Sequence, residues 1–198
     1  FNTLNVPWYY DDYRVILENP NIKDLHESFK QILSPRGIPN FTFSLNYALT
    51  GSNPFSYHIV NIMIHVIFAA LVFATFSKIY PDEKKVPLAC AILFTIHPVQ
   101  TQAVNYIVQR STLLAALFAL AAILFFILSR LEYESGNGHN KKSLVLYSIS
   151  IVAGGLAIHC KQNTAILPGL IFLVDYFFIG RNRQQFLGSL KWSIACCI

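Results

Sequence analysis

Charged residues are scarce in this sequence: Asp, Glu, Lys and Arg together make up 13% of its 198 residues. Soluble domains carry about a quarter of such residues, so this composition excludes an ordinary soluble protein. Hydrophobic residues reach 54% and gather in long runs that few charges interrupt. Such runs are typical of helices that cross a bilayer. The sequence therefore predicts an integral membrane protein.

Other features are missing as well. No glycine-rich phosphate-binding loop is present, which argues against a nucleotide-driven pump. The cysteines lack the spacing of a metal site or a disulfide framework, and we expect them to be small core residues: Cys90, Cys160, Cys196 and Cys197. The chain begins at Phe1 instead of Met, so we expect it to be a segment of a larger membrane protein.

Six apolar segments are candidate membrane spans: 56–77, 86–97, 112–129, 143–158, 164–179 and 187–198. The second is short and meets His97-Pro98, where proline disturbs the preceding helical turn. The last is cut off by the end of the chain. The expected fold is an all-α, polytopic membrane protein, in which residues 56–198 form a bundle of about six spans.

Lysine and arginine predict the orientation. If the spans alternate, nine basic residues fall on one side: Lys78, Lys84, Lys85, Arg130, Lys141, Lys142, Arg181, Arg183 and Lys191. The opposite short loops hold only Arg110 and Lys161. The positive-inside rule then places the nine on the cytoplasmic face, and it places residues 1–55 and the loops 97–111 and 159–163 outside.

Residues 1–55 are predicted to form an extracytoplasmic loop. A polar strand is expected to carry the adjacent acids Asp11 and Asp12. Residues 21–34 place apolar side chains on one helical face, which is the pattern of a helix lying in the membrane interface. A second surface helix is expected over residues 38–50.

Four stretches carry a resemblance to a known family: YYDDYRVILENP (9–20), FSLNYALTGSNPFSYHIVNIMIHVIFA (43–69), HPVQTQAVNYIVQRSTLLAALF (97–118) and KQNTAILPGLIFLVDYFF (161–178). In these stretches the chain resembles the membrane portion of the tetratricopeptide-repeat-containing O-mannosyltransferases and their bacterial relatives, within the GT-C class of glycosyltransferases. The sequence departs from the animal members at Gln102 and Gln162, where their pattern has Glu, and this leaves the exact donor and acceptor open.

The resemblance implies transfer of a sugar from a polyprenyl-phosphate carrier to a hydroxyl of a protein or glycan acceptor at the outer face. Such a transfer passes through an oxocarbenium-like state and needs a carboxylate to take the acceptor proton. We expect Asp11 to be this base and Asp12 to orient it or to bind sugar hydroxyls. The expected substrate-binding residues are Arg36, His97, Gln102, Arg110, His159, Lys161 and Gln162. Arg110 and Lys161 are the expected phosphate partners.

Each of these residues also has a structural interpretation. The acid pair can cap a turn or pair with Arg14, Arg110 can anchor its span at the interface, and Lys161 can extend its amine toward water. His97 can accept a hydrogen bond at a helix end. Asp175 is expected to pair with Arg181 or Arg183.

Three classes of function remain open: a glycosyltransferase, a non-catalytic subunit of a larger membrane complex, and a transporter. Ionisable residues gather toward one face, whereas a transporter should hold them near the midplane, so the enzyme is favoured. The expected partners are the lipid-linked sugar donor, the acceptor, membrane lipid and further subunits, and nucleic acid is not expected. The sequence identifies no cofactor other than the lipid-linked sugar donor, and use of a divalent metal by the predicted transferase is left open. The bacterial inner membrane is the favoured location, or the endoplasmic reticulum membrane for a eukaryotic chain.

Overall fold

The computed structural model describes residue 4 and residues 6–137 and 140–179, and over these residues the chain is helical and contains no strand. The α-helices in chain order are α1 (Pro20–Lys23), α2 (Leu25–Lys30), α3 (Gly37–Thr50), α4 (Pro54–Ile79), α5 (Lys85–Ile96), α6 (Gln100–Asn105), α7 (Arg110–Glu132), α8 (Lys141–Cys160) and α9 (Leu167–Val174). The expected all-α class is confirmed.

Four helical segments are long and apolar enough to cross a membrane: Pro54–Ile79, Ile107–Ser135, Lys141–Cys160 and Gln162–Ile179. They correspond to four of the predicted spans, and they make the chain a multi-pass membrane protein. The predicted span at 86–97 is the apolar helix α5, which has only 12 residues and ends at Ile96. The predicted segment 187–198 lies outside the described residues.

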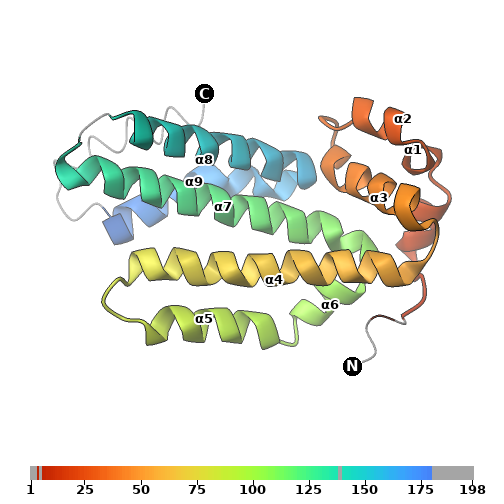
Figure 1. Cartoon of the computed structure of the whole chain (residues 1–198), viewed down its shortest axis with the longest axis horizontal. Coiled ribbons are helices and arrows are strands. Elements are labelled where there is room, and N and C mark those ends of the chain that lie inside the picture. The colour runs from red at the N-terminus through yellow and green to blue at the C-terminus, as the bar shows by residue number, and fades with distance from the viewer. Residues whose placement is uncertain (1–3, 5, 138–139, 180–198) are drawn as a thin grey trace.

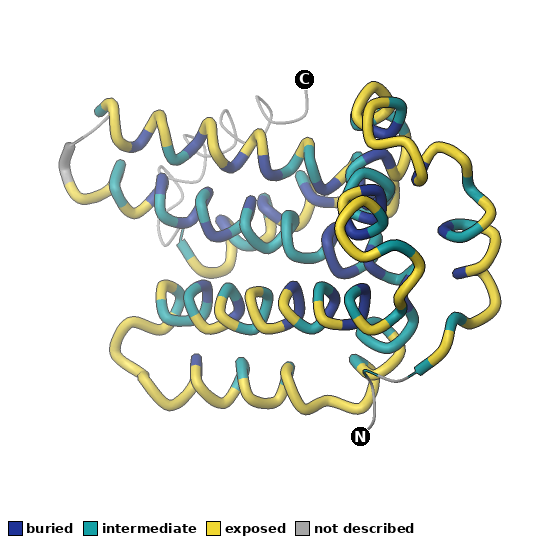
Figure 2. Tube along the Cα trace, turned by 45° about the vertical axis from the view of Figure 1, so that its right-hand side comes forward, coloured by how far each residue is buried: buried dark blue, intermediate teal, exposed yellow. Residues whose placement is uncertain are grey.

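The long helices lie side by side along the longest axis of the molecule (Figure 1). Helix α7 lies between α4 and α8, and α5 packs against α4. Apolar side chains remain exposed along the outer faces of these helices, α5 in particular (Figure 2). Leu88 and Leu93 of α5 and Met63 of α4 are examples. Such faces are suited to contact with lipid chains.

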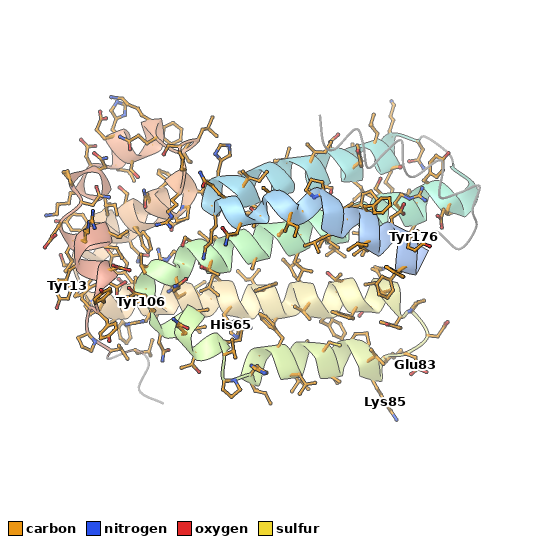
Figure 3. The ribbon with its side chains drawn as sticks, turned by 180° about the vertical axis from the view of Figure 1, so that it is seen from behind. Tyr13, His65, Glu83, Lys85, Tyr106 and Tyr176 are labelled. Atoms are coloured by element: carbon orange, nitrogen blue, oxygen red, sulfur yellow. The ribbon has the colours of Figure 1, made fainter. Side chains whose placement is uncertain are left out.

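The bundle has two different ends. At one end lie α1–α3, α6 and the turn from α8 to α9, and we call this the polar end: residues 6–53, 97–110 and 161–166. The turns 80–84 and 133–137 lie at the other end, which we call the basic end. Figure 3 shows Tyr13 and Tyr106 at the polar end and Glu83 and Lys85 at the basic end. The outer-face residues of the sequence analysis are thus gathered at one end of the bundle.

The N-terminal region differs from the prediction. In place of a strand, Asp12 leads into a π-helical turn at Tyr13–Leu17. The single helix expected over 21–34 is divided into α1 and α2 at Asp24, whose carboxylate accepts hydrogen bonds from the backbone N–H groups of His26 and Glu27 at 2.9 and 3.2 Å. An aspartate that caps a helix start interrupts any helix that precedes it. The helix expected over 38–50 is present as α3.

An ion pair joins α7 to the α9 region toward the basic end. The Nε of Arg130 lies 3.0 Å from a carboxylate oxygen of Asp175, and both side chains are buried. Glu134 adds a second carboxylate at 3.2 Å from the same guanidinium. The partner of Asp175 in the structure is therefore Arg130, whereas Arg181 and Arg183 lie outside the described residues.

Candidate active site

Arg110 is the central fixed side chain of the polar end. It begins α7, is fully buried, and donates hydrogen bonds to two other helices. Its Nε donates to Asn61 Oδ1 of α4 at 2.8 Å, and its Nη2 donates to the carbonyl oxygen of Tyr57 at 3.1 Å. From α3, Asn46 Oδ1 accepts from Nη1 at 2.8 Å, and the carbonyl oxygen of Thr42 accepts at 3.2 Å. One guanidinium therefore ties α7 to both α3 and α4.

Aromatic rings complete the surroundings of Arg110. Its guanidinium carbon lies 4.5 Å from the centre of the Phe43 ring and 5.6 Å from that of Tyr57. The polar partners are neutral amides, carbonyls and a hydroxyl, so dipoles and ring faces stabilise the charge. Because its N–H groups donate to acceptors on α3 and α4, Arg110 has a structural role and acts as an internal tie between helices. Its predicted contact with a donor phosphate stays a prediction.

Asp12 fixes the N-terminal segment onto the start of α7. Its carboxylate accepts hydrogen bonds from the backbone N–H of Val108 at 2.8 Å and from that of Tyr9 at 3.1 Å. The residue is 1% exposed. Burial raises the pKa of the Asp12 carboxyl above its ordinary value, although the two backbone donors and His58 act in the opposite direction. Asp12 thus holds the backbone that carries Asp11.

Asp11 differs from its neighbour because it is exposed. Its backbone N–H donates to the hydroxyl oxygen of Tyr106 at 3.1 Å, and the rings of Tyr106 and Tyr9 meet edge to face with centres 6.1 Å apart. Desolvation raises the pKa of the Tyr106 hydroxyl, and the charges of Asp11 and Asp12 add to this shift. The acid pair is therefore divided into a buried anchor and an exposed carboxylate.

A groove lies at Tyr106, the hydrogen-bond partner of the Asp11 backbone, although Asp11 itself is not one of its lining residues. Its volume is about 560 Å³, and its lining residues are Val6, Tyr9, Pro98, Val99, Thr101, Gln102, Asn105 and Tyr106. Of the predicted substrate-binding residues, Gln102 lies in this groove. Two aromatic rings, two amides and a hydroxyl among the lining residues suit a ligand that combines hydroxyl groups with apolar ring faces.

Lys161 lies at a second hollow of about 210 Å³, between α7 and the start of α9. Its Nζ donates to the hydroxyl of Thr112 at 2.8 Å, and Asn163 and Thr164 are further polar lining residues. The remainder of the lining is aliphatic: Ala115, Ala116, Ala119, Ile166, Leu167 and Leu170. We call this hollow the lysine cleft. It combines the ammonium group of Lys161 and the hydroxyls of Thr112 and Thr164 with an apolar wall.

The other predicted residues are spread over the polar end. His97 is exposed, and its Nδ1 accepts the backbone N–H of Val99 at 3.2 Å, as the structural interpretation expected. It also lines a third hollow, near His65. Arg36 is exposed in a left-handed conformation (φ 61°) before α3. His159 is half-buried near the end of α8, and Gln162 is exposed. These last three residues line none of the three hollows.

Tyr106 and the partners of Arg110 were not predicted from the sequence. Asn46, Asn61 and Thr42 are polar side chains in helical segments, but nothing in their spacing shows that they meet one arginine. Tyr106 lies in a short loop and carried no signal of its own. Over the described residues, no group of three or more His, Cys, Asp or Glu side chains is placed to hold a metal ion.

The fold and the polar end define a polytopic α-helical membrane protein with an acid-containing loop at one end of its bundle. The chain is 29% identical to human protein O-mannosyl-transferase TMTC3 over 89% of its length, and 33% identical to mouse TMTC2 over 93%. It is 31% identical to Drosophila melanogaster Tmtc1 over 93% of its length. The expected resemblance is thereby confirmed, and the chain is a relative of the TMTC protein O-mannosyl-transferases.

The chain spans 20–23% of the length of these three relatives. No family model matches the chain, and no solved structure does.

Replacing Arg110 by lysine should destabilise the fold strongly. Lysine keeps the charge but cannot reach the acceptors on α3 and α4 at once, so buried acceptors lose their donors. We expect a loss of about 3 kcal/mol or more in unfolding free energy, seen as a lower unfolding temperature of the full-length protein in detergent. Arg14→Lys, at an exposed position, is the control. An unchanged unfolding temperature for Arg110→Lys would show that Arg110 is not an internal tie.

Asp12 should make the stability depend on pH. Because its pKa is raised in the folded state, its contribution is fully present below its ordinary pKa of 3.8 and is lost as the pH rises through the folded pKa. Asp12→Asn cannot titrate. The difference in unfolding temperature, wild type minus Asp12→Asn, should therefore increase as the pH falls from 7 toward 4. A difference that stays flat or decreases over this range would contradict the assignment.

Proposed function

We propose that the chain forms part of a membrane glycosyltransferase of the GT-C class, which transfers a sugar from a polyprenyl-phosphate carrier to a hydroxyl acceptor. One observation carries the proposal: Asp11 is exposed and its backbone N–H bonds to Tyr106, which lines the groove, while the buried Asp12 holds the adjoining backbone in place. The relatives are named protein O-mannosyl-transferases, which favours mannose as the sugar and a protein hydroxyl as the acceptor.

Asp11 has the position that a general base requires. An acceptor hydroxyl lying in the groove would meet a carboxylate that is exposed and backed by a rigid anchor. The carboxylate takes the hydroxyl proton as the acceptor oxygen bonds to the anomeric carbon and the bond to the phosphate oxygen breaks. Gln102, in the same groove, is suited to hydrogen-bond the hydroxyls of the incoming group.

The lysine cleft has a polar part and an apolar part, which suit the phosphate and the hydrocarbon chain of a lipid phosphate. The ammonium group of Lys161 and the hydroxyls of Thr112 and Thr164 suit the phosphate, which gains negative charge as the sugar leaves. The aliphatic wall suits an isoprenoid chain arriving from the bilayer. Arg36, His159 and Gln162 lie at the same end, outside the cleft lining, and remain proposed contacts for the remainder of the donor or for the acceptor.

We place the polar end outside the cytoplasm. The described basic residues of the inter-helix turns support this placement, because Lys78, Lys84, Lys85, Arg130, Lys141 and Lys142 all belong to helix ends or turns at the basic end. Residues 1–55 would then form the outer loop and residues 56–198 the bundle. The placement is tested with two single-cysteine variants, one with its cysteine within 20–35 and the other within 80–84. A membrane-impermeant thiol reagent added from outside should label the first variant and not the second.

Asp11→Asn should remove sugar transfer without removing the fold. The amide cannot accept the proton of the acceptor, so we expect transfer of mannose from a polyprenyl-phosphate donor to fall by about 10²–10⁴-fold in the full-length protein. The unfolding temperature should stay unchanged, because Asp11 is exposed. Transfer is measured by incorporation of labelled mannose into an acceptor protein.

The matched control for this variant is Asp24→Asn, an exposed acid at the start of α2, where asparagine caps a helix about as well as aspartate. It should transfer at the wild-type rate. If Asp11→Asn transfers as fast as the wild type, Asp11 is not the base. If the wild type itself transfers no mannose, the chain is better regarded as a non-catalytic subunit.

Lys161→Met should weaken use of the lipid donor. Methionine keeps the apolar stem but removes the charge beside the phosphate, so we expect the KM for the donor to rise about tenfold or more. Lys161→Arg should restore most of the affinity. Lys30→Met, at an exposed site on α2, serves as the control. An unchanged donor KM for Lys161→Met would exclude the lysine cleft as the phosphate site.

A further inference from the structure

Tyr106 is the contact between the groove and the residue proposed as the base. It lines the groove, and its hydroxyl oxygen accepts the backbone N–H of Asp11 at 3.1 Å, although the two residues are 95 apart in the chain. Figure 3 shows Tyr106 at the same end of the molecule as Tyr13, which follows Asp11 by two residues. One phenol therefore joins the groove proposed for the acceptor to the proposed base.

The backbone on both sides of Tyr106 is fixed to α4. The amide nitrogen of Asn61 donates to the carbonyl oxygens of Val104 and Ile107 at 3.4 Å each. Asn61 is held in turn by the buried Arg110, whose Nε donates to its amide oxygen at 2.8 Å. A side chain on a backbone fixed in this way loses little further conformational entropy when it holds another group. Tyr106 is therefore suited to position a neighbouring residue.

Asp11 lies in a tight turn of the N-terminal segment. The backbone N–H of Asp12 donates to the carbonyl oxygen of Tyr9 at 3.0 Å, so Tyr10 and Asp11 are the two central residues of this turn. Tyr10 has φ 46°, a left-handed conformation that is uncommon for a residue with a large side chain. The carboxylate of Asp12 holds one end of the turn. The bond to Tyr106 attaches the centre of the turn to the groove.

The hydroxyl of Tyr106 has a proton to donate as well as an oxygen that accepts. Desolvation raises the pKa of this hydroxyl, and a hydrogen bond to the side chain of Asp11 raises it further, although the Asp11 backbone N–H acts in the opposite direction. The hydroxyl therefore keeps its proton at neutral pH. It can hold the backbone of Asp11 through its oxygen and the carboxylate of Asp11 through its O–H.

We propose that Tyr106 is a positioning residue for Asp11, whose hydroxyl holds the carboxylate in one orientation at the edge of the groove. The inference rests on the proposed function and adds a residue that acts through the base. A general base works only when its oxygen is within hydrogen-bond reach of the proton that it takes. A displacement of about 1 Å can lower the rate by about 100-fold. An exposed carboxylate on a turn would otherwise move between several rotamers.

Tyr106→Phe removes the hydroxyl and keeps the ring that packs on Tyr9. In the full-length protein in detergent, kcat for mannose transfer should fall about tenfold. The KM for the donor should stay unchanged, because the phosphate site is assigned to the lysine cleft. The unfolding temperature should also stay unchanged, because the contact is exposed and water can replace the phenol oxygen. Tyr13→Phe loses an exposed hydroxyl at the same end, and as the matched control it should transfer at the wild-type rate.

A double-mutant cycle tests whether Tyr106 acts through Asp11. In an Asp11→Asn background, Tyr106→Phe should cause little further loss of transfer, because the base that it positions is already absent. A purely structural or acceptor-binding role would lower transfer by the same factor in both backgrounds, and that result overturns the proposal. The proposal is also overturned if transfer depends on Asp11 but Tyr106→Phe has the kcat of the wild type.

Amide hydrogen exchange tests the contact without any transfer and so separates this inference from the proposed function. The Asp11 N–H is bonded in the wild type, so its exchange rate should rise several-fold in Tyr106→Phe and stay unchanged in Tyr13→Phe. An unchanged exchange rate in Tyr106→Phe overturns the positioning role, whatever the transfer rates are. If the exchange rate rises as expected but the wild type transfers no mannose, the contact is present and the proposed function is what fails.

Discussion

The polar end depends on one buried guanidinium. Arg110 begins α7 and donates to side chains and carbonyls of α3 and α4, so three segments are fixed relative to one another by a single group. Asn61 extends this network, because its amide nitrogen donates to the carbonyl oxygens of Val104 and Ile107 at 3.4 Å each. The loop that carries Tyr106 is thereby attached to α4. The groove is lined by Tyr106, and both it and the third hollow are lined by residues of α6, which immediately precedes this loop.

The charged side chains of the polar end are of two kinds: some are buried and bonded within the protein, and others are accessible to other molecules. Arg110 and Asp12 are buried, with their hydrogen-bonding capacity directed at the protein. Asp11 is exposed, and Lys161 reaches a hollow open to other molecules. A buried charge must be satisfied internally and is poorly suited to bind a substrate, whereas the exposed group beside it is available. Arg110 and Asp12 therefore hold the structure of the polar end, and the exposed Asp11 and the half-buried Lys161 carry the proposed chemistry.

The sequence predicted the positions of the membrane-spanning helices better than it predicted which side chains contact one another. Apolar runs predicted four of the described spans to within a few residues, because desolvation of a long helix dominates the local energetics. The same runs placed Arg110 and Lys161 at the same end but could not separate their roles, since burial of Arg110 depends on Asn46, 64 residues away. Asp11 and Asp12 are likewise indistinguishable as neighbours, and the backbone N–H groups of Tyr9 and Val108 decide which one is anchored. Residues 21–34 were predicted as one helix from their apolar face, and the division at Asp24 follows from the cap that this residue supplies to α2.

The short helix α5 explains why hollows occur at this end at all. Its 12 residues extend about 18 Å, well short of the roughly 30 Å hydrocarbon core, whereas the 26 residues of α4 extend about 39 Å. The chain must therefore leave α5 below the level at which α4 begins, and Pro98 follows directly. Non-helical backbone at such depth needs internal partners. It finds them in the bonds from Gln100 N–H to the His97 carbonyl oxygen at 2.9 Å and from Thr101 N–H to that of Pro98 at 3.0 Å, and in the Val99 N–H bond to His97 Nδ1. With its backbone satisfied, this segment can bring polar side chains beneath the rim of the bundle, where they line one hollow together with His65 of α4.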